Sequence, residues 1–528
     1  MAQNHLAFAT LDPNTLSGEN PVQLYNIVQG EWGLPAESKD IPDPLNGESF
    51  IKMPNTGLSE IDPFVDSLKQ CPKTGLHNPL KNVERYVMYG EISARVAALL
   101  REKEVEDFFT RCIQRVMPKS DAQARGEVVV VRVFFENFAG DGVRFLARGF
   151  SNPGNHAGQK SNGYRWPYGP VAIVSPFNFP LEIPVLQLMG ALYMGNKVLI
   201  KNASTTSMVL EQFVRLLHQC GMPKEDVDMI HCGGRVMGTL LERAPIRSLQ
   251  FTGSSQVAEQ LANTMKGKIF MEDAGFDWKI IGPDYNPQHF DYVAWQADQD
   301  AYASSGQKCS AQSILFAHQN WEKAGLFDKL KELASRRSLE HLTIGPVLTE
   351  STERMLGHMN RLLEIEGARL VFGGKELEGH NIPDYYGSIE PTAVYVPLEE
   401  LMKEENFEVC CTEIFGPFQV LTSWNDEQLD LVLEAVERMD LHLTAAVVSN
   451  DILFLQKVLA HTVNGTTYAG IRARTTGAPQ NHWFGPAGDP RGAGIGTTEA
   501  IQLVWSCHRE IIEDFGPLPE DWTLPFPT

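Results

Sequence analysis

The sequence lacks the long apolar runs that a membrane-spanning helix requires, since no apolar stretch in its 528 residues reaches spanning length. Positive charge is also scarce: 45 Lys and Arg residues stand against 66 Asp and Glu residues, so the formal net charge is -21. A nucleic acid or an anionic membrane would repel such a chain. We therefore expect neither as a partner.

Cysteine is scarce and shows no pattern. The eight cysteines form no CxxC pair and no His/Cys ligand spacing, which argues against a disulfide framework and a structural zinc site and indicates a reducing compartment. We predict no metal site. Cys410 and Cys411 are interpreted as core residues, because neighbouring cysteines seldom satisfy disulfide geometry.

The first 170 residues combine short apolar runs with helical patterns. The Asn46-Gly47 pair predicts a hairpin. Apolar residues at three- and four-residue spacing predict a helical region over 83–115, and a second helical region follows over 128–150. The Gly- and Asn-rich segment 151–168 is typical of a loop with extended arms.

Strands alternate with helices between residues 171 and 271. We expect strands at 171–174, 197–201, 228–231, 249–251 and 268–271, with helices at 181–194, 207–220, 236–241 and 255–265. This alternation predicts a doubly wound parallel sheet, whose ligands bind at the carboxyl ends of the strands. The residues at those ends are Asn178, Lys201, Gly233, Gly234, Gly253, Ser254 and Glu272.

A second α/β region follows Asp273. Its expected helices span 320–337, 350–364 and 426–438, and its expected strands span 369–372, 417–423 and 443–448. The apolar run 501–505 near the C-terminus lies outside this pattern, and we expect a subunit contact there.

A Gly/Ser-rich segment, Ser304-Ser305-Gly306-Gln307-Lys308-Cys309-Ser310-Ala311, lies between an expected helix at 292–303 and an expected strand at 313–318. A cysteine in such a break has an approachable sulfur, as a nucleophilic thiolate requires. The alternative is a buried packing cysteine, which composition alone favours.

Six motifs occur in order along the chain: Ser175–Pro180, Lys201, Phe251–Ser254, Met271–Gly275, Gly306–Cys309 and Thr412–Pro417. In this order and spacing the chain resembles the NAD(P)-dependent aldehyde dehydrogenase superfamily over nearly its whole length. Segments 306–311 and 474–478 are similar to those of glutamate-semialdehyde (1-pyrroline-5-carboxylate) dehydrogenases, and segments 163–169 and 480–485 to those of the plant branch of that activity.

The resemblance implies an α/β fold with two doubly wound parallel-sheet domains and a small β oligomerisation domain. The NAD-binding domain would comprise 1–150 and 169–271, the catalytic domain 272–485, and the oligomerisation segments 151–168 and 486–528. It further implies NAD as cofactor, a small aldehyde as substrate, a homo-oligomer (dimer or tetramer) and the mitochondrial matrix. Residues 1–17 carry no Arg and no apolar signal core, so we expect no transit peptide within this chain.

Three catalytic residues follow from the resemblance. The Cys309 thiolate would attack the aldehyde carbonyl to give a thiohemiacetal, and the Asn178 amide with the Cys309 backbone N–H would stabilise the oxyanion. Glu272 would activate water to hydrolyse the later thioester, provided that its pKa is raised. For Asn178 the alternative is a cap on the helix that begins near residue 181.

Ten residues would contact the cofactor: Ser175, Phe177, Lys201, Ser204, Gly234, Gly253, Ser254, Val257, Glu413 and Phe415. Lys201 would reach the adenosine ribose and Glu413 the nicotinamide ribose, although each taken alone could be a solvated surface residue. The turn at Gly253 would let a helix N-terminus approach the diphosphate. Ser204 stands where an acidic residue often binds the ribose in relatives, which leaves the choice between NAD and NADP open.

Six residues would bind the substrate: Phe179, Ser310, Thr476, Gly477, Ala478 and Phe484. Hydroxyl and backbone N–H groups would hold the carboxylate of glutamate 5-semialdehyde, and the two phenylalanines would enclose its aliphatic middle. The alternative is that Ser310 is merely small and Gly477 merely a turn former. His482 could be a pocket residue or a loop residue, and the sequence favours neither.

The predicted function is NAD-dependent oxidation of L-glutamate 5-semialdehyde to L-glutamate in proline catabolism. The rival within the superfamily is a broad-specificity aldehyde dehydrogenase. The rival of another class is a non-catalytic scaffold that has kept the fold. The joint presence of Cys309, Glu272 and Asn178 argues against the scaffold.

Overall fold

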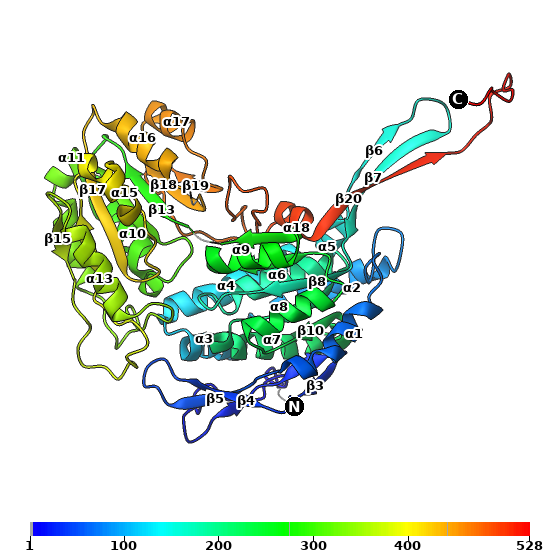
Figure 1. Cartoon of the computed structure of the whole chain (residues 1–528), viewed down its shortest axis with the longest axis horizontal. Coiled ribbons are helices and arrows are strands. Elements are labelled where there is room, and N and C mark those ends of the chain that lie inside the picture. Colours follow the sequence, from blue (N-terminus) through cyan, green and yellow to red (C-terminus); the bar gives the residue numbers. More distant parts are fainter. Residues whose placement is uncertain (1–3, 274, 441) are drawn as a thin grey trace.

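Two seven-stranded sheets form the centre of the protein, and two three-stranded sheets lie outside them (Figure 1). The computed structural model describes residues 4–273, 275–440 and 442–528. The last strand of the first large sheet ends at Glu272, and the first strand of the second begins at Asp277. Cys309 lies farther along the chain, shortly before β14, Gln312–His318, of the second sheet.

The first large sheet has the strand order β12-β11-β8-β9-β10-β2-β3. Its first five strands are parallel and β2 and β3 are antiparallel, which confirms the doubly wound prediction for residues 171–271. The strands are β2 Asn26–Val28, β3 Glu31–Gly33, β8 Pro170–Val174, β9 Lys197–Lys201, β10 Val227–Met229, β11 Leu249–Thr252 and β12 Ile269–Glu272.

Helices cover both faces of this sheet (Figure 1). All twelve residues of α6, Glu182–Tyr193, are buried, so this helix lies wholly inside the protein. The others are α1 Asp62–Gln70, α2 Glu84–Leu99, α3 Lys103–Val116, α4 Asp121–Asn137, α5 Gly142–Leu146, α7 Ser207–Gln219, α8 Gly234–Arg243 and α9 Ser255–Thr264. Short 3-10 turns are η1 Leu58–Glu60, η2 Ser204–Thr206, η3 Lys224–Asp226 and η4 Pro287–His289.

The second large sheet has the order β15-β16-β17-β14-β13-β18-β19 and is parallel except for β15. Its strands are β13 Asp277–Ile281, β14 Gln312–His318, β15 Arg369–Phe372, β16 Thr392–Tyr395, β17 Phe418–Trp424, β18 Thr444–Val448 and β19 Thr466–Ala469. Its helices are α10 Phe290–Tyr302, α11 Gln319–Lys323, α12 Leu326–Ala334, α13 Thr352–Leu363, α14 Leu398–Leu401, α15 Glu404–Cys410, α16 Leu429–Arg438 and α17 Ile452–Leu459.

Three long helical stretches of the sequence are each divided in two. The stretch 83–115 becomes α2 and α3, the stretch 128–150 becomes α4 and α5, and the stretch 320–337 becomes α11 and α12. Gly140 has φ 58° and Gly325 has φ 93° at two of these breaks. A left-handed residue ends a helix even where the apolar spacing continues.

The N-terminal region contains the sheet β1-β5-β4, formed by β1 Val22–Gln23, β4 Ser38–Pro42 and β5 Ser49–Pro54. β4 and β5 are antiparallel, and Gly47, with φ 77°, lies in the turn between them. The predicted Asn-Gly hairpin is therefore confirmed.

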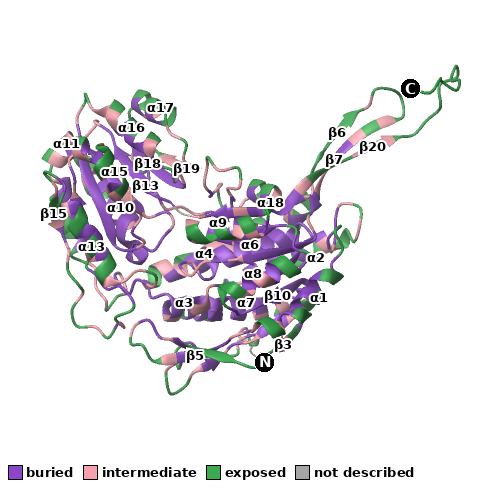
Figure 2. Ribbon diagram, in the orientation of Figure 1, coloured by how far each residue is buried: buried purple, intermediate pink, exposed green. Residues whose placement is uncertain are grey.

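The fourth sheet projects from the body as an arm of three antiparallel strands, β6 Phe150–Pro153, β7 Gln159–Pro167 and β20 Ser506–Asp514 (Figure 1). β20 pairs with β7 along its whole length, from Ser506 opposite Pro167 to Asp514 opposite Gln159. Figure 2 shows β6 as exposed and β20 as partly exposed, whereas β7 between them is mostly intermediate or buried.

The apolar run 501–505 belongs to the helix α18, Thr498–Trp505. We expected a subunit contact at this run, and for its buried residues that expectation is wrong. Ile501, Val504 and Trp505 are at most 2% exposed and join the core of this same chain. The run was misread because burial against the chain's own α6 leaves the same apolar pattern as burial against a partner.

Candidate active site

Cys309 lies on the loop between α10 and β14, directly after an unusual turn, η5 Ala303–Gly306. Ser304, Ser305 and Gly306 have φ values of 56°, 55° and 68°, so three consecutive residues are left-handed. Such a backbone is costly for serine and persists only where its surroundings impose it. Strain of this kind is concentrated at functional sites in proteins.

Contacts from two other segments impose this turn. The Gly345 N–H donates to Ser305 Oγ at 2.8 Å, and Gln307 Nε2 donates to the Pro346 carbonyl at 2.9 Å. A Cβ on Gly306 would lie 2.0 Å from the Gly416 carbonyl oxygen, so only glycine fits there. The backbone that presents Cys309 is therefore held from both sides.

Glu272, the last residue of β12, lies beside the Cys309 thiol and is 2% exposed. Neither of its carboxylate oxygens has a hydrogen-bond partner among the described residues. Burial raises the pKa of Glu272 to about 7, and burial together with the Glu272 charge raises the pKa of Cys309 well above its usual range. A carboxylate with such a pKa is suited to remove a proton at neutral pH.

Asn178 is 3% exposed and lies before α6, but it does not cap that helix. The Glu127 carboxylate accepts hydrogen bonds from the Leu181 and Glu182 N–H groups at 2.7 and 3.0 Å. The capping alternative for Asn178 is therefore wrong, because a glutamate from α4 does that work. The side-chain amide of Asn178 is left available for another role.

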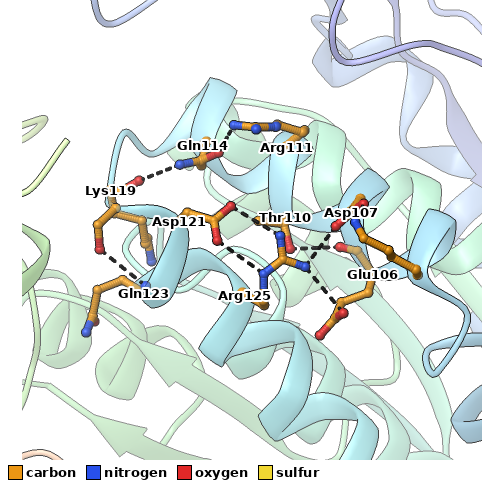
Figure 3. A network of polar contacts seen from close by, with 11 residues as sticks. Glu106, Asp107, Thr110, Arg111, Gln114, Lys119, Asp121, Gln123 and Arg125 are labelled. Carbon is orange, nitrogen blue, oxygen red and sulfur yellow. Dashed lines mark hydrogen bonds and ion pairs between the residues drawn. The ribbon is translucent and has the colours of Figure 1, made fainter. Parts of the chain in front are cut away.

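Lys119 fixes the backbone of Asn178. Its ammonium group is wholly buried and donates to the Asn178 carbonyl at 2.8 Å and to Glu127 at 3.1 Å. Figure 3 shows how the turn before α4 is secured: Gln114 Nε2 donates to the Lys119 carbonyl at 3.0 Å, and Arg125 bonds Asp107 of α3 at 2.8 Å.

A small cavity opens at the Cys309 sulfur. Its lining residues are Phe179, Glu182, Ile183, Cys309, Ser310, Thr476, Gly477, Pro479, Phe484 and Ile495. Five of the six predicted substrate residues are thus brought together around the predicted nucleophile. Ala478 does not line this cavity, and its carbonyl instead accepts a hydrogen bond from Asn481 N–H at 3.0 Å.

A hydroxyl cluster forms one wall of the cavity. Ser310 Oγ donates to Thr476 Oγ1 at 3.2 Å, and Lys308 Nζ donates to the same oxygen at 3.0 Å. Burial lowers the pKa of Lys308 to about 8, so the ammonium form predominates at neutral pH. Sequence reasoning missed Lys308, although it precedes the nucleophile and would place a positive charge behind any bound carboxylate.

The loop 474–479 is held from behind. The Thr475 N–H donates to Asp300, which forms a buried ion pair with Lys279 at 2.7 Å. A Cβ on Gly477 would lie 1.4 Å from the Tyr468 hydroxyl oxygen, and that hydroxyl bonds His482 Nε2 at 2.8 Å. His482 is therefore a loop-supporting residue and does not line the cavity.

The predicted diphosphate side is more open. Helices α8 and α9 begin at Gly234 and Ser255, and neither has a side-chain cap at its N-terminus. Gly233, Gly234, Ser254 and Val257 are exposed there. Free N–H groups at helix N-termini suit an anionic diphosphate, so these residues fit a dinucleotide.

The remaining predicted cofactor residues form two groups. Ser175 Oγ donates a hydrogen bond to Asn202 Oδ1 at 2.9 Å, next to Lys201. Burial lowers the pKa of Lys201. Ser204 begins the turn η2 that follows. On the predicted nicotinamide side, the rings of Phe177 and Phe415 meet edge to face, with their centroids 5.9 Å apart. Burial raises the pKa of Glu413 to about 8. Gly253 packs closely on Phe251, since a Cβ there would lie 2.6 Å from its ring.

Within the described part of the chain, no three His, Cys, Asp or Glu side chains are arranged to hold a metal ion, and the eight cysteines are unpaired. None of the helices described there is both long and apolar enough to cross a membrane.

Solved structures share this fold at low sequence identity. An NAD-dependent aldehyde dehydrogenase from Sinorhizobium meliloti matches with a TM-score of 0.81 at 19% identity, covering 97% of this chain and 99% of that one. Aldehyde dehydrogenase 21 from Physcomitrella patens, solved with the reaction product succinate, matches with a TM-score of 0.80 at 19% identity, covering 94% of this chain and 100% of that one.

Two plant proteins are far more similar in sequence. The mitochondrial delta-1-pyrroline-5-carboxylate dehydrogenase 12A1 of Arabidopsis thaliana is 64% identical over 99% of this chain and 94% of its own length. A probable aldehyde dehydrogenase of Linum usitatissimum is 64% identical over 98% of this chain and 94% of its own. The model of the aldehyde dehydrogenase family matches residues 36–497. This chain belongs to the aldehyde dehydrogenase family.

Proposed function

We propose that the protein oxidises L-glutamate 5-semialdehyde, which forms from 1-pyrroline-5-carboxylate, to L-glutamate with NAD, the second step of proline breakdown. The observation that carries the proposal is the small cavity lined by Cys309 together with Ser310 and Thr476, whose hydroxyls bond to each other. The 64% identity to the Arabidopsis thaliana pyrroline-5-carboxylate dehydrogenase, over nearly the whole chain, supports the same substrate.

The first step uses Cys309. Its thiol releases a proton to solvent, and the thiolate attacks the aldehyde carbon to form a thiohemiacetal. The raised pKa of Glu272, about 7, suits this carboxylate to the later proton transfer from water near neutral pH.

The oxyanion that develops is stabilised by fixed donors, the side-chain amide of Asn178 and the backbone N–H of Cys309. Lys119, which holds the Asn178 carbonyl, keeps this segment in place. The left-handed turn before Cys309 orients its N–H in the same way. Such preorganised donors commonly contribute 10²–10³ in rate, about 3–4 kcal/mol each.

Bound NAD supplies the acceptor for the substrate hydride, whose loss leaves a thioester on Cys309. The uncapped N-terminus of α9 would hold the diphosphate, Lys201 the adenosine ribose, and Glu413 with Phe415 the nicotinamide end. Glu272 then deprotonates a water molecule that hydrolyses the thioester, which releases glutamate and restores the thiol.

The division of the chain into an NAD-binding domain, a catalytic domain and an oligomerisation arm belongs to the same proposal. The edge strands β6 and β20 of the arm would pair with other copies in a dimer or tetramer. The mitochondrial location in the name of the Arabidopsis thaliana relative supports a matrix location here.

The test is a rate measurement with purified protein, NAD and a panel of glutamate 5-semialdehyde, propanal and hexanal. We expect kcat/KM for glutamate 5-semialdehyde to exceed the others by at least about a hundredfold, since two charge-assisted hydrogen bonds are worth about 3–6 kcal/mol. Equal efficiencies across the panel would support a broad-specificity aldehyde dehydrogenase instead.

A further inference from the structure

Glu182 is a buried carboxyl group in the Cys309 cavity for which the proposed mechanism has no use. It is the first residue of α6, is 9% exposed, and lines the cavity together with Cys309, Ser310 and Thr476. The eleven other residues of α6 carry no charge. A carboxyl group is expensive to bury at such a place unless it has a partner.

The tasks that would explain Glu182 structurally are performed by Glu127. That carboxylate accepts the hydrogen bonds of the first two N–H groups at the start of α6. It also takes the ion pair with Lys119, whose side chain is fully buried, while the same ammonium donates to the Asn178 carbonyl. Glu182 is therefore needed neither to cap its helix nor to neutralise the buried lysine.

The Glu182 carboxyl group itself has no hydrogen bond or ion pair to any described residue. Its oxygens are not fully buried. The charged groups that act on it are Glu127, Lys119 and Glu272, two carboxyls and one ammonium. Burial raises the pKa of Glu182 well above its usual range, and the nearby carboxyls raise it further, because the cavity disfavours an uncompensated negative charge. A cation bound beside this carboxyl group would compensate that charge and favour the carboxylate form.

The proposed substrate carries such a cation. Cys309 takes its aldehyde, and the hydroxyl cluster of Ser310 and Thr476 with Lys308 behind it takes its α-carboxylate. Its α-ammonium group then needs an acceptor in the same cavity. Resting on the function proposed above, we propose that Glu182 binds the substrate α-ammonium group and so selects amino-acid aldehydes over aldehydes that carry only a carboxylate.

The matched substrate is 5-oxopentanoate, which has the same chain, aldehyde and carboxylate but no amine. For the wild-type protein, we expect kcat/KM to be about ten- to a hundredfold higher for glutamate 5-semialdehyde. In Glu182→Gln this preference should vanish, because efficiency falls with the amine-bearing substrate and is kept or increased with 5-oxopentanoate. Glu182→Asp, which keeps the charge, should retain part of the preference.

Activity with 5-oxopentanoate is the internal control for folding. Equal losses with both substrates in Glu182→Gln would indicate a structural role at the start of α6 and overturn the proposal. An unchanged preference in Glu182→Gln would also overturn it, since an uncharged hydrogen-bonding group would then suffice. A wild-type protein that oxidises neither substrate refutes the function proposed above, whereas one that oxidises both equally refutes only the role of Glu182.

Discussion

The two sides of Cys309 are built differently. On the proposed substrate side, Ser310 and Glu182 are nearly buried and the loop at Thr475 is anchored to the buried Lys279–Asp300 pair. On the proposed cofactor side, the starts of α8 and α9 are exposed and uncapped. A rigid, enclosed site suits selection of one small aldehyde. Open helix starts suit a large cofactor that must enter and leave in each turnover.

The sulfur between the two sides should be indispensable. We expect Cys309→Ser to lower the oxidation rate by at least about a thousandfold, because a serine hydroxyl is a far weaker nucleophile near neutral pH. NAD affinity, measured by fluorescence titration, should change by less than about twofold, since other residues bind the cofactor. Retention of more than about a tenth of the rate would remove Cys309 from the nucleophile role.

Glu272 should affect the two halves of the reaction unequally. General bases contribute about 10²–10⁴ in rate, so we expect Glu272→Gln to slow steady-state turnover by about a hundredfold or more. Rapid mixing should show a burst of reduced cofactor before the slow phase, with an acyl-enzyme trapped on Cys309. If both phases slow equally and no acyl-enzyme is found, Glu272 is a structural residue.

Ser310→Ala should damage the substrate side alone. One charge-assisted hydrogen bond is worth about 1.5–3 kcal/mol, so we expect kcat/KM for glutamate 5-semialdehyde to fall about ten- to a hundredfold. Propanal, which has no carboxylate, is the matched control and should be oxidised at nearly the wild-type rate, with KM for NAD unchanged. Equal losses with both aldehydes would mean that the carboxylate is bound elsewhere.

Ser204→Glu should damage the cofactor side alone. A carboxylate near the adenosine ribose would repel the 2′-phosphate of NADP, so we expect efficiency with NADP to fall about tenfold relative to NAD. The KM for the aldehyde is the control and should not change. A variant with an unaltered ratio of NAD to NADP efficiency would place the ribose away from Ser204.

The smallest effect concerns stability. Burial raises the pKa of Glu272 to about 7 in the folded protein, above its unfolded value of 4.5. Its contribution to stability is therefore fully present below pH 4.5 and lost as the pH rises through 7, a change of about 3 kcal/mol. Calorimetry at pH 8 should find Tm of Glu272→Gln higher by about 3 °C, with the gain vanishing near pH 5. A pH-independent difference would exclude titration of Glu272 as its cause.

Features that depend on local sequence could be predicted. The strands of the first sheet, the Asn46-Gly47 hairpin and the loop that carries Cys309 all have signals within a few residues. Besides the nucleophile, nine residues line the cavity, and the family motifs identified five of them. The domain boundaries and the individual catalytic roles stay predictions.

Features that depend on contacts between distant segments could not be predicted. Nothing in the sequence indicates that Lys119 holds the Asn178 carbonyl. Nor does it indicate that Glu127 caps the start of α6, 54 residues farther along the chain. The burial of Glu182 at the start of an apolar helix is likewise visible only in the structure. The family resemblance assigned the C-terminal segment to a β domain, but the residue pattern does not locate β20, because its exposed, charged residues resemble a solvated tail.

The arm has a consequence for how the chain is made. Ser161 of β7 and Glu510 of β20 bond to each other although they lie 349 residues apart. During synthesis β7 therefore emerges early and waits as an unprotected edge until nearly the entire polypeptide has left the ribosome. Loss of the final twenty or so residues would leave that edge permanently open, and the predicted cellular outcome is aggregation or chaperone retention of a chain whose catalytic centre is otherwise complete.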